Sequence, residues 1–225
     1  MKPMNAPIVC IVPGYGIPRN EEQIRHLQTY LRQVKESLSQ IQLLPREALH
    51  VVLSGGPTAF IPPYEDTEAG EMLKVLRSNV SGQVTFHLEE QAASTLENIL
   101  YAKALLARLE IEPGEVIIFV ENIRVKRMRE IVTLVLPNYK VRLVPVDLGH
   151  QADKAAQSGE KLATALLKWT LEKPSNLAWY HDLGVEKISA AREAYKRGVP
   201  FNNVEWWQTK WELIKERLRN DGYEV

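Results

Sequence analysis

The sequence contains very little cysteine: Cys10 is the only one among 225 residues. A single thiol cannot form an internal disulfide or a metal cluster that needs several cysteines. Because Cys10 stands inside an apolar run, residues 8–12, we expect it to be buried and unreactive. The sequence therefore excludes folds that depend on disulfides and zinc sites built from cysteine.

An excess of charge of either sign is also absent. Lys and Arg number 28, Asp and Glu number 28, and the formal net charge is zero. This balance argues against broad electrostatic binding to nucleic acid or to an anionic membrane. No stretch approaches the roughly 20 apolar residues of a membrane span, and the first apolar run is too short for a secretory signal. We therefore expect a cytoplasmic protein with no membrane span and no nucleic-acid partner.

Several motifs that would identify a chemistry are missing. The sequence has no P-loop, no zinc-binding spacing and no nucleophile elbow. The histidines without ligand-like spacing are His26, His50, His87 and His181. The remaining one, His150, follows Asp147 and is a candidate general base, although an ordinary loop histidine is the simpler interpretation.

What the sequence does contain is an alternation of short apolar runs with longer amphipathic segments, and a hydrophobic fraction of 45% that suffices for a sizeable core. The apolar runs predict strands over residues 8–12, 49–53, 83–88, 116–120 and 141–146. The amphipathic segments between them predict helices over residues 21–41, 67–78, 95–109 and 125–136. This alternation is typical of parallel strands joined by right-handed crossovers.

The pattern predicts a Rossmann-like three-layer α/β sandwich over residues 1–150. We expect a five-stranded, mainly parallel sheet in the order 3-2-1-4-5. The near-continuous apolar character of the strands fits a sheet that is covered on both faces. Ligands in such sheets bind beyond the C-terminal ends of the strands, here at the switch point between the first and fourth strands.

Residues 151–225 are predicted to form a helical C-terminal extension packed on this domain. Helices are expected over residues 154–171, 175–196 and 203–219, with Gly184 as a candidate break in the second. One face of the last helix carries Trp207, Trp211, Ile214 and Leu218. Such a face predicts packing against the α/β domain or against a second copy of the chain, as a homodimer formed through the C-terminal helices.

Glycines follow the first two predicted strands. Gly14 and Gly16 come after the first strand, and Gly55 and Gly56 come after the second. Glycines in these places let backbone N–H groups approach an anion closely, so all four are candidate ligand contacts. The third glycine of the dinucleotide fingerprint is missing, and a tight strand-to-helix turn explains the first pair equally well.

Polar side chains stand at the starts of two predicted helices. Glu68 falls in a first turn, where an acid is also favoured simply by the helix dipole. Ser94 and Glu97 form a capping box, which accounts for both without a ligand but leaves Thr95 and Asn98 unexplained. In the site hypothesis Glu68 and Glu97 are the catalytic carboxylates, which hold hydroxyls or position a water or a metal, and Thr95 and Asn98 orient the ligand.

A basic segment follows the fourth strand. Arg124, Lys126 and Arg127 begin a helix, against the preference of a helix N-terminus for acids. This placement indicates a role in holding a phosphate or a carboxylate, and a solvated basic face is the alternative. We expect Arg127, together with Arg124, to neutralise an anionic small-molecule ligand.

Taken together, these segments resemble the bacterial DUF218 family, also described as YdcF-like or SanA/ElyC-like. The resemblance runs from residue 8 to residue 147, and it is carried by Gly14, Gly16, Leu53-Ser54-Gly55-Gly56, Thr67-Glu68-Ala69, Met72, Glu89, Thr95-Leu96-Glu97-Asn98 and Arg127. The sequence departs from the family pattern at Ser94, where Asn is usual, and at Ile123-Arg124, where Phe-His is usual. The resemblance implies a Rossmann-like fold with a polar pocket.

We therefore expect a small-molecule enzyme that acts on, or uses, a phosphate-bearing or nucleotide-like ligand. Phosphoester hydrolysis and group transfer both stay open, because no pair of nucleophile and base is evident in the sequence. No cofactor is identified beyond a nucleotide-like ligand. The alternative is a non-catalytic protein that binds a nucleotide-like ligand or has a regulatory role, and the absence of the family's histidine favours it.

Overall fold

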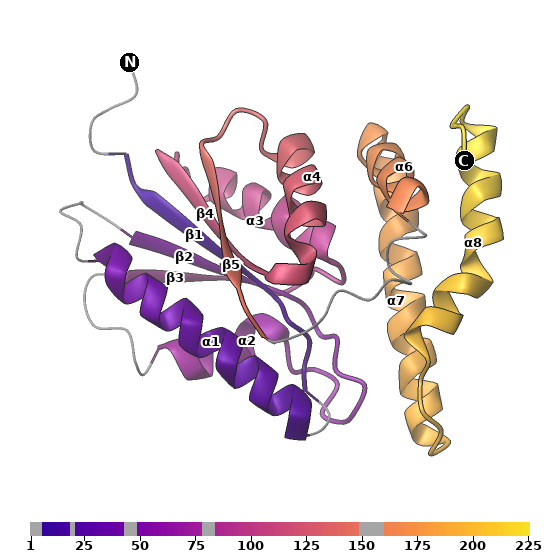
Figure 1. Ribbon diagram of the computed structural model, residues 1–225, viewed down its shortest axis with the longest axis horizontal. Coiled ribbons are helices and arrows are strands. Elements are labelled where there is room, and N and C mark those ends of the chain that lie inside the picture. Colours follow the sequence, from indigo (N-terminus) through magenta and orange to yellow (C-terminus); the bar gives the residue numbers. More distant parts are fainter. Residues whose placement is uncertain (1–5, 19–20, 43–48, 78–83, 149–159) are drawn as a thin grey trace. The chain divides into compact units, whose positions relative to one another are not determined.

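The computed structural model describes residues 6–18, 21–42, 49–77, 84–148 and 160–225. The chain divides into two compact units, Met1–His150 and Gln151–Val225. The first unit is built from strands and helices, and the described part of the second is helical (Figure 1).

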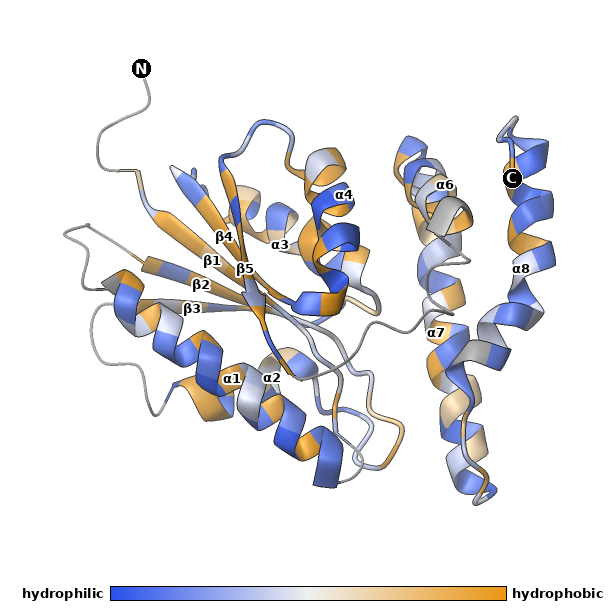
Figure 2. Ribbon diagram, viewed as in Figure 1, coloured by the Kyte–Doolittle hydropathy of each residue, from blue (hydrophilic) through white to orange (hydrophobic). Residues whose placement is uncertain are grey.

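Five strands of the first unit form one parallel sheet in the order β3-β2-β1-β4-β5. They are β1 (Ile8–Pro13), β2 (Leu49–Ser54), β3 (Val84–Glu89), β4 (Glu115–Glu121) and β5 (Val141–Val146). The central strands β1, β2 and β4 are apolar along most of their length (Figure 2). The predicted Rossmann-like fold is therefore confirmed, with β1 in the middle of the sheet and β2 and β4 as its parallel neighbours.

Helices cover both faces of the sheet. One face is covered by α1 (Glu21–Gln42) and α2 (Glu68–Leu76), and the other by α3 (Thr95–Arg108) and α4 (Val125–Val135), which follows the 3₁₀ turn η1 (Asn122–Arg124). Alternate residues of each strand serve the two faces. Cys10, for example, packs in the buried cluster beneath α1 and α2, and burial raises the pKa of its thiol to about 12. The predicted burial of Cys10 is thus confirmed, and the thiol stays protonated at neutral pH.

The strand register brings the loops of the predicted site to one edge. Pro13, Ser54 and Glu89 are aligned across β1, β2 and β3. Just beyond them, the N–H of Gly14 donates to the carbonyl of Ser54 at 2.5 Å, and the N–H of Gly55 donates to the carbonyl of Glu89 at 2.9 Å. Backbone hydrogen bonds therefore continue past the sheet and connect the loops that follow its first three strands.

The second unit contains α6 (Glu160–Glu172), α7 (Pro174–Lys196) and α8 (Asn203–Asn220). The candidate break at Gly184 is wrong, because α7 continues through it. A glycine inside a helix costs only about 1 kcal/mol, and the buried side chains of Leu183 and Ile188 hold this helix in place.

The aromatic face of α8 packs within the second unit. Trp169 of α6 is fully buried, and the core around it includes Ile214 and Leu218, with Trp207 and Trp211 packed against this core. Packing of this extension on the α/β unit, or on a second copy of the chain, stays a prediction.

Across the described ranges, none of the helices combines the length and the apolar content that crossing a bilayer requires.

Two histidines pair on the face of the sheet opposite the α1 and α2 cluster. Nδ1 of His50 on β2 lies 3.0 Å from Nε2 of His87 on β3. The ring centroids are 5.2 Å apart and the ring planes differ by 22°. Partial burial lowers the pKa of both imidazoles, and for His87 the neighbouring His50 contributes to the decrease. Both rings therefore favour the neutral form in the folded chain.

We expect this pair to make the stability of the protein dependent on pH below about 6.5, the ordinary pKa of histidine. Since the pKa of each ring is lower in the folded chain, the unfolded chain binds protons more readily. The stabilising contribution is therefore complete above the ordinary pKa and is lost as the pH falls through the lowered values. Melting temperatures between about pH 7.5 and about pH 5.5 test this. The H50Q/H87Q double variant should lose less over this interval than the wild type, and an equal loss would contradict the prediction.

Candidate functional site

A hollow opens at the C-terminal edge of the sheet, between the loops that follow β1 and β4. It is lined by Pro13, Gly14, Tyr15, Tyr30, Thr95, Phe119, Val120, Glu121, Arg124 and Met128. These strands flank the switch point of the sheet, which is where ligands bind in folds of this kind. Three predicted site residues, Gly14, Thr95 and Arg124, therefore border one space.

An arginine with a carboxylate partner lies at this hollow. Nε of Arg124 lies 3.1 Å from Oε2 of Glu121, whose side chain is 3% exposed, whereas the Arg124 side chain is 47% exposed. The guanidinium carbon lies 5.9 Å from the ring centroid of Tyr15, within reach of a cation–π interaction. Arg124 is thus oriented by two contacts while much of its side chain remains accessible to solvent.

Two tyrosines, Tyr15 and Tyr30, line the hollow together with this arginine. The rings of Tyr15 and Tyr30 stack with centroids 5.5 Å apart, and the hydroxyl of Tyr30 donates to the carbonyl of Pro13 at 3.3 Å. Burial, with a contribution from the charge of Glu121, raises the pKa of Tyr15 to about 12. The Tyr15 hydroxyl therefore keeps its proton at neutral pH and can donate a hydrogen bond.

The N-terminus of α3 reaches the same hollow through Thr95. The predicted capping box is present in part: Ser94 Oγ accepts from the N–H of Glu97 at 3.2 Å, whereas Glu97 Oε2 accepts from the N–H of Ala93, one residue before the N-cap, at 2.9 Å. Among the residues that the structure describes, none accepts a hydrogen bond from the N–H groups of Thr95 or Leu96. Because the first N–H groups of a helix favour an anion, this end of α3 remains open to one.

The N-terminus of α2 is closed in contrast. The N–H groups of Glu68 and Ala69 donate to the carbonyls of Gly56 and Gly55 at 3.1 and 3.0 Å. These are the first two donors of the helix, and the loop after β2 occupies both. The first two N–H groups of α2 are therefore not available to bind an anion next to this loop.

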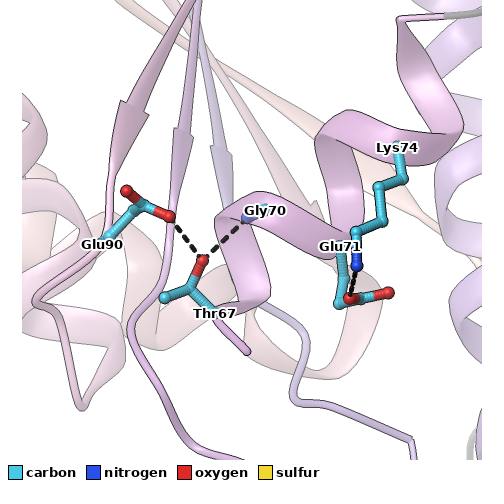
Figure 3. A network of polar contacts seen from close by, with 5 residues as sticks. All are labelled: Thr67, Gly70, Glu71, Lys74 and Glu90. Atoms are coloured by element: carbon cyan, nitrogen blue, oxygen red, sulfur yellow. Dashed lines mark hydrogen bonds and ion pairs between the residues drawn. The ribbon is translucent and has the colours of Figure 1, made fainter. Parts of the chain in front are cut away.

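The third donor of α2 belongs to a polar network at the helix start (Figure 3). Oγ1 of Thr67 accepts from the N–H of Gly70 at 3.0 Å and donates to Oε1 of Glu90 at 2.7 Å. One turn later Lys74 and Glu71 form an ion pair at 2.5 Å. Thr67 is an N-cap that also fastens the loop after β3 to α2, so this network is structural.

Glu68 occupies the space that the glycines of the loops leave free. A Cβ on Gly14 would lie 1.6 Å from Oε2 of Glu68, and a Cβ on Gly55 would lie 2.7 Å from its Cβ. The hydroxyl of Thr58 donates to Oε1, and Glu68 is 8% exposed. Gly14 and Gly55 are therefore required for the close approach of this carboxylate, and their contact with a ligand stays a prediction.

The remaining predicted glycines have other roles. A Cβ on Gly56 would lie 2.8 Å from the carbonyl oxygen of Ala92, so this glycine allows two loops to pack. Gly16 faces open space, and its φ of +97° is a conformation that favours glycine.

A second polar group is buried between β2, β3 and α3. Oγ of Ser54 lies 2.5 Å from Oε2 of Glu89 and 3.0 Å from the carbonyl oxygen of Asn98. The other oxygen of Glu89 accepts from the N–H groups of Gln91 and Ala92 at 2.7 and 3.1 Å. Asn98 thus contributes to an interior network instead of lining the hollow, as does Ser54, which the site hypothesis did not include.

Glu97 is fully buried, and its contacts are those of a cap. Besides the bond from Ala93, its Oε1 accepts from the hydroxyl of Tyr101 at 3.3 Å. Burial, with the charge of Glu97, raises the pKa of Tyr101 to about 12.

The two arginines predicted for the site, Arg124 and Arg127, do not both lie at the hollow. Nη1 of Arg127 lies 3.3 Å from Oε2 of Glu130, one turn along α4, and Arg127 does not line the hollow. Of the two arginines, Arg124 is therefore the one placed to neutralise a ligand in the hollow.

Sequence reasoning missed Tyr15, Glu121 and Tyr30. The first two stand at strand ends, which is a usable signal, but Tyr30 lies in the middle of α1 and nothing local marks it.

The predicted pairing of Asp147 with His150 cannot be followed, because His150 lies outside the described residues. The backbone of Asp147 is held by the side chain of Gln33, which donates to its carbonyl at 2.8 Å and accepts from its N–H at 3.3 Å. Within the described ranges, no group of three or more His, Cys, Asp or Glu side chains is arranged to hold a metal ion.

We expect Gly14→Ala to destabilise the protein by about 1–3 kcal/mol, the usual cost of overpacking, because the new methyl group meets Glu68. Gly16→Ala is the matched control: it meets no neighbour and costs only the strain of its positive φ. Adding Glu68→Ala should recover stability in the Gly14→Ala background and not in the Gly16→Ala background. Urea unfolding of the single and double variants measures the coupling, and equal responses in the two backgrounds would refute the contact.

We expect Glu97→Ala to cost about 1–3 kcal/mol, because it removes the acceptor of the Ala93 N–H. Glu97→Gln should unfold close to the wild type, since the amide oxygen still accepts this bond and the amide nitrogen can donate to Tyr101. Thermal unfolding tests both variants. If Glu97→Gln unfolds like the wild type yet loses all response to a ligand, Glu97 belongs to the site and its role as a cap is secondary.

The chain matches no known family model, and no curated protein is significantly similar to it. The resemblance to the DUF218 family therefore rests on the quoted residues alone and stays a prediction. What the site does has to be inferred from its own geometry.

Proposed function

We propose that this protein is an enzyme that acts on, or uses, a small phosphate-bearing or nucleotide-like molecule bound in the hollow between β1 and β4. The observation that carries the proposal is that Arg124, Tyr15 and Thr95, the first residue of α3, line one space. A phosphate group suits these partners, since a guanidinium and helix N–H groups bind its oxygens well.

Each partner has a distinct role in this proposal. The N–H and hydroxyl of Thr95 hold a phosphate at the end of α3, and Arg124 meets its charge from the solvent side. Glu121, which lines the hollow, accepts a hydrogen bond from a hydroxyl or a water. Glu68 lies behind Gly14 and holds the loop that shapes the hollow.

A non-catalytic binding protein is the second candidate. It is favoured by one observation: Arg124 stands where the resembled family has a histidine, and no histidine is among the residues that line the hollow in the described structure. The two candidates differ in turnover. An enzyme converts a bound ligand by hydrolysis or by group transfer, whereas a binder is only stabilised by it.

The cellular setting belongs to the same proposal. A cytoplasmic protein would meet phosphorylated metabolites at high concentration, and the buried, protonated thiol of Cys10 suits a reducing compartment. Membership of the DUF218 family is proposed on the same footing, because its motif residues surround this edge of the sheet.

The test is a thermal-shift panel of inorganic phosphate, ribose 5-phosphate, AMP and, as the match without phosphate, adenosine. A ligand at 100 times its Kd stabilises by about 2.7 kcal/mol, which a melting curve resolves. We expect the phosphorylated compounds to stabilise the protein and adenosine to have little effect. Product analysis of each stabilising compound then separates the enzyme from the binder, and a panel without any stabilising phosphate would reject the proposal.

We expect Arg124→Ala to weaken binding of the best phosphorylated compound by about 10- to 150-fold, the equivalent of about 1.5–3 kcal/mol for a charged hydrogen bond. Arg127→Ala is the matched control, because Arg127 pairs with Glu130 away from the hollow. Titration calorimetry on both variants measures the difference. Since removal of Arg124 leaves the buried Glu121 without this partner, Arg124→Lys keeps the charge and checks that loss of binding is not loss of folding. Equal weakening by the two alanine variants would count against the site.

A further inference from the structure

The pair of His50 and His87 lies away from the hollow. His50 is the second residue of β2 and is in register with Thr85, so His87 lies two residues further along β3 and on the same face. β3 is an edge strand of the sheet, and both histidines are half-buried. His50 therefore stands near the start of β2 and His87 just past the middle of β3, whereas the hollow lies beyond the C-terminal ends of β1 and β4.

The geometry of the rings describes a hydrogen bond between two neutral imidazoles. With 3.0 Å between Nδ1 of His50 and Nε2 of His87, 5.2 Å between the centroids and 22° between the planes, the rings lie end to end in nearly one plane. One facing nitrogen carries a proton and the other carries a lone pair. Such a pair has two ring nitrogens already close together and accessible at the sheet edge.

We propose that His50 and His87 form a two-histidine site for a late first-row divalent cation, Ni²⁺, Cu²⁺ or Zn²⁺, with water in the remaining coordination positions. Imidazole nitrogen is a preferred ligand of these ions. Two nitrogens bound at about 2.0–2.1 Å are about 3 Å apart at the right angles that suit Ni²⁺ and Cu²⁺, and about 3.3 Å apart in the tetrahedral coordination of Zn²⁺. The pair already has a separation of 3.0 Å. Only a turn of each ring is needed for the two lone pairs to converge on one ion.

Binding of the ion does not require either imidazole ring to lose a proton to solvent. The donor ring moves its proton to its other nitrogen, so each ring stays neutral with one proton while both facing nitrogens bind the ion. Partial burial lowers the pKa of both rings, so protons compete little with the metal at neutral pH. No third His, Cys, Asp or Glu completes the group among the described residues, which is why water fills the other positions.

The experiment titrates Ni²⁺ and Zn²⁺ into the full, untagged chain at about pH 7.5 by calorimetry, with EDTA reversal followed by thermal shift. The wild type should bind one ion at this site. Each of H50Q and H87Q should weaken this binding at least about tenfold, the equivalent of about 1.4 kcal/mol. H26Q and H181Q remove one imidazole elsewhere and should bind as the wild type does.

Glutamine can still hydrogen-bond between the strands, so these variants should fold, and melting in EDTA checks this. If they do not fold, selective broadening of the His50 and His87 ring resonances by Ni²⁺ in the wild type supports the site. Broadening elsewhere, unchanged binding in H50Q and H87Q, or no binding to the wild type would overturn it. These measurements use no phosphorylated compound, so the outcome is independent of the function proposed for the hollow.

Discussion

The approach of the Glu68 carboxylate to Gly14 and Gly55 is the contact on which the whole C-terminal edge of the sheet depends. Both glycines must lack a side chain for Glu68 to fit. Once it is there, the first N–H groups of α2 face the carbonyls of the loop after β2 and bond to them. The β2 side of the edge is thereby filled with protein. On the other side of β1 the edge keeps a hollow between the loops that follow β1 and β4, which is the space that the proposed function uses.

The buried carboxylates of this edge are held in different ways, and they differ in whether they line the hollow. Glu89 is occupied by a serine hydroxyl and two backbone N–H groups, and Glu97 caps its own helix. Glu121 instead lines the hollow and orients Arg124. A buried acid costs free energy unless it is hydrogen-bonded. Of these three acids, Glu121 is therefore the one that lines the hollow, and the proposed function uses this carboxylate.

The fold followed from the sequence because strand and helix periods alternate clearly and each loop ends in a turn signal, so element order and parallel pairing had one simple solution. The site was less predictable. The choice between Arg124 and Arg127 depends on the short turn η1 that precedes α4, and no residue pattern predicted it. The role of Gly14 depends on a side chain more than 50 residues away, and Tyr30 enters from the middle of a helix. Such placements are tertiary, and local patterns do not encode them.

The first turn of α3 explains why a motif at a helix start is ambiguous as a sign of function. Within four residues Thr95 borders the hollow, Glu97 caps the helix and Asn98 bonds to a serine of the interior. Successive residues of a helix point in different directions, so one short motif contributes to a binding surface and to the core together. A resemblance carried by such a motif is therefore partly a resemblance in how the edge of the sheet folds. Among these three residues, Thr95 is the one that borders the hollow, so the proposed function rests on this residue of the motif.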